Sequence, residues 1–119
     1  MAPSPILFAN TMGATMAQFD VYVNPISAAR RAYPFVVAMQ SDFARNTRDQ
    51  IVAPLVRREA MPKVVSRLTP IVVVDGSEYL AIVPALAGVR TRDLAELSAS
   101  LESARSELLA AIDFLFFGI

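Results

Sequence analysis

The hydrophobic pattern of the chain changes period once, and this change restricts the fold more than any other feature. Up to Val89, apolar residues form short runs or alternate with polar ones, which is typical of β-strands. From Asp93 onward, apolar residues recur at intervals of three and four, which is typical of a helix. The sequence therefore predicts a mainly β fold with one carboxy-terminal α-helix, which must pack on a sheet or a partner.

Apolar and β-branched runs predict strands at 18–24, 35–40, 51–56, 70–74, 77–83 and 86–89. Asp75-Gly76 separates two of these runs and predicts a hairpin, because both residues can adopt positive φ. The first two runs are expected to pair antiparallel across a long loop. In the first run, apolar residues alternate from Phe19 to Val23, which predicts one buried and one exposed face. Pro54 cannot donate to a ladder, so its strand is expected at an edge or bulge.

The predicted helix carries a stripe of Leu94, Leu97, Leu101, Leu108, Ile112 and Leu115. Asp93 and Glu96 resemble a capping box at its start, and its firmest part spans Leu101 to Phe117. Gly118 is expected to end it in a left-handed conformation. The tail 113–119 is unusually apolar, so it is either buried on the core or kept for a partner. The helical pattern alone favours burial.

Composition excludes several kinds of protein. Eleven basic and eleven acidic residues cancel, which argues against direct nucleic-acid binding, since such domains are usually basic. The chain has no histidine and no cysteine, which removes thiolate and histidine metal sites and His-dependent triads and dyads. No cofactor or metal is expected. No apolar run approaches the roughly 20 residues that cross a bilayer, so no membrane association and a cytoplasmic location are expected.

The length of 119 residues indicates one domain. Residues 1–15 contain prolines and lack the basic start of a signal peptide, so they are interpreted as a flexible leader or an extension. The folded domain is then 16–119. Ser41, Asp42 and Arg45 could form a catalytic cluster, but without histidine they are more typical of a turn. No catalytic residue is assigned, and the residue chemistry favours a binding module over an enzyme.

Two basic doublets, Arg30-Arg31 and Arg57-Arg58, are either solvated or available to an acidic segment of another protein. No other feature of the composition chooses between these two interpretations. The charged connector 57–67 and the loop 26–34 that hold them are therefore the candidate contacts for an acidic partner.

Several stretches occur in a specific order: Gln18-Phe19-x-Val21-Tyr22, Val37-x-x-Gln40-Ser41-Asp42, Ile51-Val52-x-Pro54-Leu55, Pro70-Ile71-Val72, the Asp75–Tyr79 turn, and Ala111-Ile112-x-x-Leu115-Phe116-x-Gly118-Ile119. In these stretches the chain resembles the CcdB toxins of bacterial toxin–antitoxin systems. The resemblance implies a small antiparallel SH3-like barrel with a three-stranded wing, shared with MazF-type ribonuclease toxins. It also implies a homodimer that binds the A subunit of DNA gyrase, traps the enzyme on cleaved DNA and blocks replication without being an enzyme. A cognate antitoxin with a disordered carboxy-terminal arm would wrap this dimer.

The resemblance further implies gyrase-contacting positions at Phe117, Gly118, Ile119, Asp113, Phe43 and Ala44. The antitoxin contacts are assigned, from charge alone, to the four arginines of the doublets. The resemblance reverses the preference for burial at the last three residues, while Phe114, Leu115 and Phe116 include the share that packs on the core. The best-known member has tryptophan at the position of Phe117 and asparagine at that of Asp113.

Two alternatives stay open. Because Phe117 and Asp113 differ from the best-known member, the chain could be a homologue that binds its antitoxin and represses transcription but does not poison gyrase. Because MazF-type toxins share this fold, the second alternative is a MazF-like endoribonuclease, in which Arg45 or Arg48 would stabilise the transition state.

Overall fold

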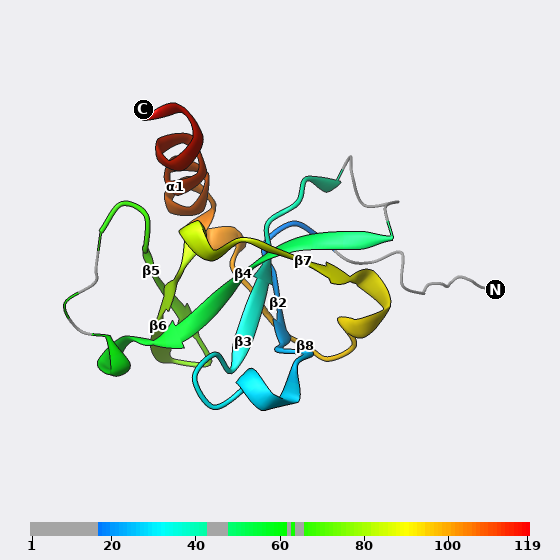
Figure 1. Ribbon diagram of the computed structural model, residues 1–119. Helices are drawn as coiled ribbons and strands as arrows, with labels where there is room; N and C mark the ends of the chain where they lie inside the picture. Colours follow the sequence, from blue (N-terminus) through cyan, green and yellow to red (C-terminus); the bar gives the residue numbers. More distant parts are fainter. Residues whose placement is uncertain (1–16, 43–47, 62, 64–65) are drawn as a thin grey trace.

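The computed structural model describes residues 17–42, 48–61, 63 and 66–119. Within these residues, seven strands form one antiparallel sheet that curls into a half-barrel, with a single α-helix at the carboxy-terminal end (Figure 1). The strands are β2 (Asp20–Val23), β3 (Phe35–Ala38), β4 (Asp49–Arg57), β5 (Ile71–Val74), β6 (Ser77–Ala81), β7 (Ala87–Arg90) and β8 (Leu97–Ser100). The helix is α1 (Arg105–Phe117), and the short 3₁₀ turns are η2 (Ser27–Ala29), η4 (Arg58–Ala60), η5 (Val83–Ala85), η6 (Thr91–Asp93) and η7 (Glu102–Ala104).

The order of strands across the sheet is β5-β6-β4-β3-β2-β8, and β7 pairs with the first part of β4. The antiparallel pairing of β2 with β3 and the hairpin of β5 and β6 are as predicted. Asp75 and Gly76 form the hairpin turn with φ of 50° and 79°, the positive values that this dipeptide favours. The hairpin and the end of β4 together make a three-stranded extension of the sheet.

The expectation that Pro54 marks an edge or bulge was wrong, because β4 is central. It pairs with β3 along one side, and on the other side with β7 up to Val52 and with β6 from Leu55 onward. Pro54 lies between these two partners, where its carbonyl accepts a hydrogen bond from the Ile82 N–H at 2.9 Å. Proline has no amide hydrogen, but at this position the partner of β4 changes from β7 to β6. The sheet therefore loses few main-chain hydrogen bonds.

The prediction of one exposed face for the first strand was also wrong, since both faces of β2 are covered. On the helix side lies the main core, which includes Phe19, Val21, Leu55 and Leu108. On the opposite side, a second cluster contains Tyr22, Val36, Ala38, Val52 and Leu94. Asp20, Asn24 and Gln50 are buried as well. Long connections fold over this second side, which a single strand pattern does not reveal.

Burial on this second side changes two titrations. It raises the pKa of the Asp20 carboxyl, against the hydrogen bond that this group accepts from the Ala17 N–H, and the nearby Asp42 charge adds to the rise. Burial raises the pKa of the Tyr22 hydroxyl to about 12, with the Asp20 charge acting in the same direction. In both cases the folded structure disfavours the charged form relative to a free side chain.

The predicted helix begins later than its leucine spacing indicates. The segment after Asp93 forms β8, whose pairing with β2 is supported by a hydrogen bond from the Val23 N–H to the Glu96 carbonyl at 3.0 Å. The proposed capping pair Asp93 and Glu96 thus precedes a strand. Leu97 is 61% exposed, so its position in the spacing was coincidental. Pairing with β2 satisfies main-chain groups that a frayed helix start would leave to water.

Candidate functional site

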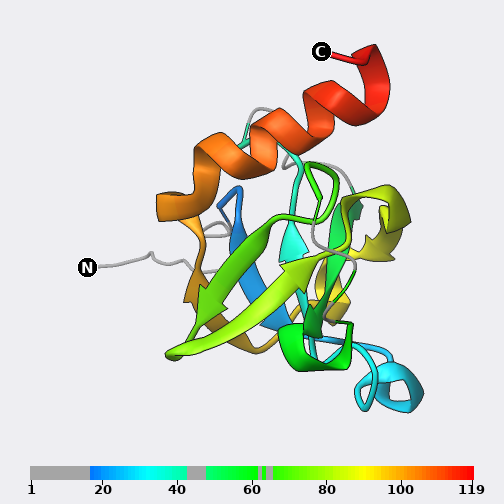
Figure 2. The same cartoon turned by 90° about the vertical axis from the view of Figure 1, so that its left-hand side faces the viewer.

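The last turn of α1 and the residues after it carry large apolar side chains that are exposed in the part of the chain that the structure describes. Phe116, Phe117 and Ile119 are 61%, 72% and 77% exposed, whereas Leu108 and Ala111, earlier in the helix, are fully buried. The helix crosses one side of the sheet and its final turn extends past it (Figures 1 and 2). The last turn is therefore out of reach of the core that covers the earlier turns.

The other apolar residues of this turn differ in their surroundings. Leu115 packs against the main core, and Phe114 is half-buried outside it. Of the three residues expected to include the core contact, Phe116 is therefore the one that faces solvent. Gly118 ends the helix as predicted, with φ of 72° and its N–H donating to the Phe114 carbonyl at 3.1 Å.

Asp113 lies on the exposed surface of α1, four residues before Phe117. Residues four apart lie on the same side of a helix, so the carboxylate is a neighbour of the Phe117 ring. The last turn contains no basic residue to balance this charge, and carboxylates are disfavoured at the carboxyl end of a helix. The exposed apolar end thus carries one negative charge that its own helix does not compensate.

Arg67 contacts this end from outside the helix. Its guanidinium carbon lies 4.2 Å from the centre of the Phe114 ring, and its Nη2 donates to the Ile119 carbonyl at 3.0 Å. Sequence reasoning assigned Arg67 only to a charged connector. No local pattern could have found this contact, because it joins residues 52 positions apart.

An apolar groove of about 460 Å³ runs along the flank of α1 next to the exposed end. It is lined by Met39, Gln40, Ile51, Leu86, Ala87, Gly88, Ile112 and Phe116. Ile51 is 40% exposed, so the apolar surface continues from the helix onto β4. An apolar surface that joins a groove to exposed aromatic rings is typical of a protein–protein contact.

Phe43 and Ala44, the two expected loop contacts, lie outside the described residues, as does Arg45. The preceding residue, Asp42, is fixed by accepting a hydrogen bond from the Gln18 N–H at 2.7 Å. This main-chain contact agrees with a turn role for Asp42. Met39 and Gln40, just before it, line the groove beside Phe116.

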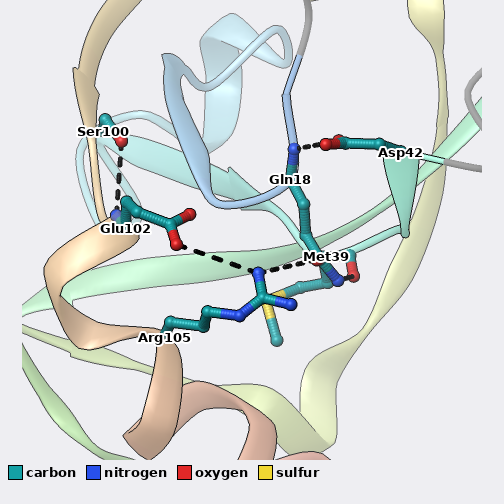
Figure 3. A network of polar contacts seen from close by, with 6 residues as sticks. All are labelled: Gln18, Met39, Asp42, Ser100, Glu102 and Arg105. Atoms are coloured by element: carbon teal, nitrogen blue, oxygen red, sulfur yellow. Dashed lines mark hydrogen bonds and ion pairs between the residues drawn. The ribbon is translucent and has the colours of Figure 1, made fainter.

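Gln18 connects this segment to the start of the helix (Figure 3). Its side-chain amide donates to the Met39 carbonyl at 3.1 Å and accepts a hydrogen bond from Arg105 at 3.3 Å. Arg105 also lies 3.9 Å from the Glu102 carboxylate. The main-chain N–H of Glu102 donates to the Ser100 hydroxyl at 3.2 Å. These polar contacts hold the first turn of α1 against the sheet and so help to set the helix direction.

Within each arginine doublet, the two side chains have different contacts. Arg30 donates to the Asn24 carbonyl at 2.6 Å, and Arg58 forms an ion pair with Glu78 at 3.0 Å. Arg31 and Arg57, by contrast, line one pocket of about 260 Å³. The remaining residues around this pocket are Ala32, Tyr33, Val56, Ala60 and Met61. The structure thus brings together one arginine of each doublet beside an apolar surface.

The described residues contain no cluster of three or more acidic side chains that could hold a metal ion. In the part of the chain that the structure covers, no helix has the length and hydropathy to cross a membrane.

The fold and the exposed helix end can now be compared with known proteins. The family model of the CcdB protein matches residues 18–118, which is most of the chain. The chain belongs to the CcdB family. Toxins of the CcdB family are non-enzymatic poisons of DNA gyrase, and the half-barrel with one carboxy-terminal helix is consistent with the CcdB fold. No curated protein matches this CcdB-family chain.

Proposed function

We propose that this CcdB-family protein is the toxin of a toxin–antitoxin system, which binds the A subunit of DNA gyrase and traps the enzyme on cleaved DNA. The observation that carries the proposal is the exposed apolar end of the chain, 72% at Phe117, the last residue of α1, and 77% at Ile119, just beyond it. Exposing such side chains to water is unfavourable, so a surface of this kind favours a partner that covers it.

In this proposal Phe117, Gly118 and Ile119 form the gyrase contact, and Asp113, Phe43 and Ala44 add to it. The Phe117 ring offers a face on which an arginine of the partner can stack. Large side chains at the centre of a desolvated contact usually supply most of its binding energy. The toxin would act in the cytoplasm, where it would meet gyrase on replicating DNA.

The apolar groove beside Phe116 supports the proposed homodimer. A twofold interface uses the same surface on both copies, and burying Ile51, Leu86 and Ile112 against their equivalents would remove the groove from water. Two helix ends near one axis would then present a paired aromatic surface to gyrase.

The pocket shared by Arg31 and Arg57 is the proposed contact for the antitoxin arm. A disordered acidic segment would place a carboxylate between the two guanidinium groups and an apolar side chain against Tyr33 or Met61. Arg30 and Arg58 would contribute less, because Asn24 and Glu78 already occupy them.

One observation favours a second candidate, a homologue that binds its antitoxin but does not poison gyrase. Asp113 places a carboxylate beside Phe117, and burying that charge in a contact without a partner group is costly. Gyrase affinity therefore depends on whether the partner supplies a cation at this point.

A pull-down of the gyrase A subunit with the purified protein, together with induced expression in cells that lack an antitoxin, tests the proposal. We expect a complex and growth arrest with trapped DNA breaks, both lost when residues 117–119 are deleted. The deletion should leave the fold unchanged, because these residues lie outside the core. Growth arrest that survives the deletion would contradict the tail mechanism, and absence of a complex would favour the second candidate. Degraded RNA after induction would instead indicate a ribonuclease.

A further inference from the structure

The contact between Arg67 and the helix end has two parts that act on different atoms. The guanidinium lies over the Phe114 ring at 4.2 Å, in the range where a cation is attracted to an aromatic face. The same group donates to the main-chain carbonyl of Ile119 at 3.0 Å. Arg67 therefore spans the last turn, from inside the helix to the residue beyond Gly118.

This contact holds the main chain of the tail and leaves its side chains free. Phe117 and Ile119 stay 72% and 77% exposed, although the Ile119 carbonyl is bound. The carboxyl end of a helix carries partial negative charge, and the last turn has no basic residue of its own. Arg67 supplies the cation that this end lacks.

Arg67 is itself presented by a tight turn. The Ser66 N–H donates to the Thr69 hydroxyl at 3.0 Å, and the Thr69 N–H donates back to the Ser66 carbonyl at 3.0 Å. The Leu68 N–H donates to the Ser66 hydroxyl at 3.2 Å, and Thr69 is buried. Three hydrogen bonds around one residue fix the main chain from which the Arg67 side chain extends.

We propose that Arg67 is a positioning residue, which orders the tail before any partner binds and so strengthens binding to gyrase. The inference rests on the proposed function. A tail that is already ordered loses less conformational freedom on binding, and this saving appears as affinity. Phe117 and Ile119 are the proposed contacts, whereas Arg67 would touch neither their side chains nor the partner.

The test uses Arg67→Ala, Arg67→Lys and Phe114→Leu in the full chain, with Arg92→Ala as the matched loss of an exposed arginine in η6, outside the proposed contact surfaces. The first measurement is the ¹H–¹⁵N heteronuclear NOE of the Gly118 and Ile119 amides, which reports local order and not global stability. The second is the Kd for the purified gyrase A subunit. Thermal unfolding verifies that each variant is folded.

We expect Arg67→Ala and Phe114→Leu to lower the NOE at both amides and to weaken binding about three- to tenfold, from a lost cation–aromatic contact and, in the arginine variant, a lost hydrogen bond. Arg67→Lys keeps a donor and a charge but no planar group, so it should recover part of both losses. Arg92→Ala should change neither.

An unchanged NOE in Arg67→Ala would overturn the ordering role. A reduced NOE with unchanged Kd would overturn the link to binding. If the wild-type protein does not bind gyrase, the proposed function fails, and the NOE alone decides whether Arg67 orders the tail.

Discussion

The middle and the last turn of α1 both carry apolar residues, but they meet opposite environments. Leu108 and Ala111 are fully buried against the sheet, while Phe116 and Phe117 are 61% and 72% exposed. All four are apolar and belong to one continuous helix. Hydrophobicity alone therefore does not decide burial here. A turn of the helix is buried only where the sheet extends beneath it.

The difference separates stability from recognition along one element. The earlier turns fill the core, so changes there should unfold the protein. The last turn contributes little to the core, so changes there should affect partners and leave the fold intact. The following substitutions test this division, in order of decreasing expected effect.

Leu108→Ala should destabilise the protein by about 2–5 kcal/mol, because it removes buried methyl groups and leaves a cavity. Urea unfolding followed by circular dichroism measures this loss. Leu97→Ala is the control, since that leucine is 61% exposed and its truncation should cost less than about 0.5 kcal/mol. Equal losses in the two variants would contradict the assigned core.

Phe117→Ala should weaken gyrase binding by at least about thirtyfold, the effect of losing a central aromatic contact worth about 2 kcal/mol. Its stability should stay within about 0.5 kcal/mol of the wild type. Titration calorimetry and urea unfolding give the two numbers. Val73→Ala, which truncates a 55% exposed residue on β5, should alter neither. A Phe117→Ala variant that unfolds but still binds would reverse the proposed division.

Gly118→Ala should destabilise the helix end by about 1 kcal/mol, because alanine is strained at the φ of 72° found there. A Cβ would meet no atom within 4 Å, so the effect comes from the main chain alone. Gly118→Asn should lose less than alanine, since asparagine tolerates the left-handed conformation better. A larger loss with asparagine in thermal unfolding would show that side-chain size matters instead.

Asp113→Asn should raise stability by about 0.3–0.5 kcal/mol, because it removes a negative charge near the carboxyl end of α1. Glu107→Gln, in the first turn of the helix, should lower it by a similar amount. Thermal unfolding at low and high salt measures both changes, and salt should reduce them. Shifts of the same sign would show that the helix dipole is not the cause.

Much of the fold was predictable from local residues. Asp75-Gly76 defined its hairpin, and Gly118 defined the end of α1, since both act through their own main-chain angles. The start of α1 was not predictable in this way, because pairing with β2 turned 97–100 into a strand. The central position of Pro54 was not predictable for the same reason, because it depends on which strands flank β4.

The candidate site divides along the same line. The sequence by itself determined the apolar tail, the glycine that ends the helix and the family resemblance of the closing motif, all of which are contiguous in the chain. Only the tertiary structure decided that Phe116 faces solvent, that Arg31 and Arg57 share a pocket, and that Arg67 holds the Ile119 carbonyl. Local rules follow from neighbouring main-chain angles and side-chain spacing, whereas these contacts join residues that only the folding of the sheet brings together.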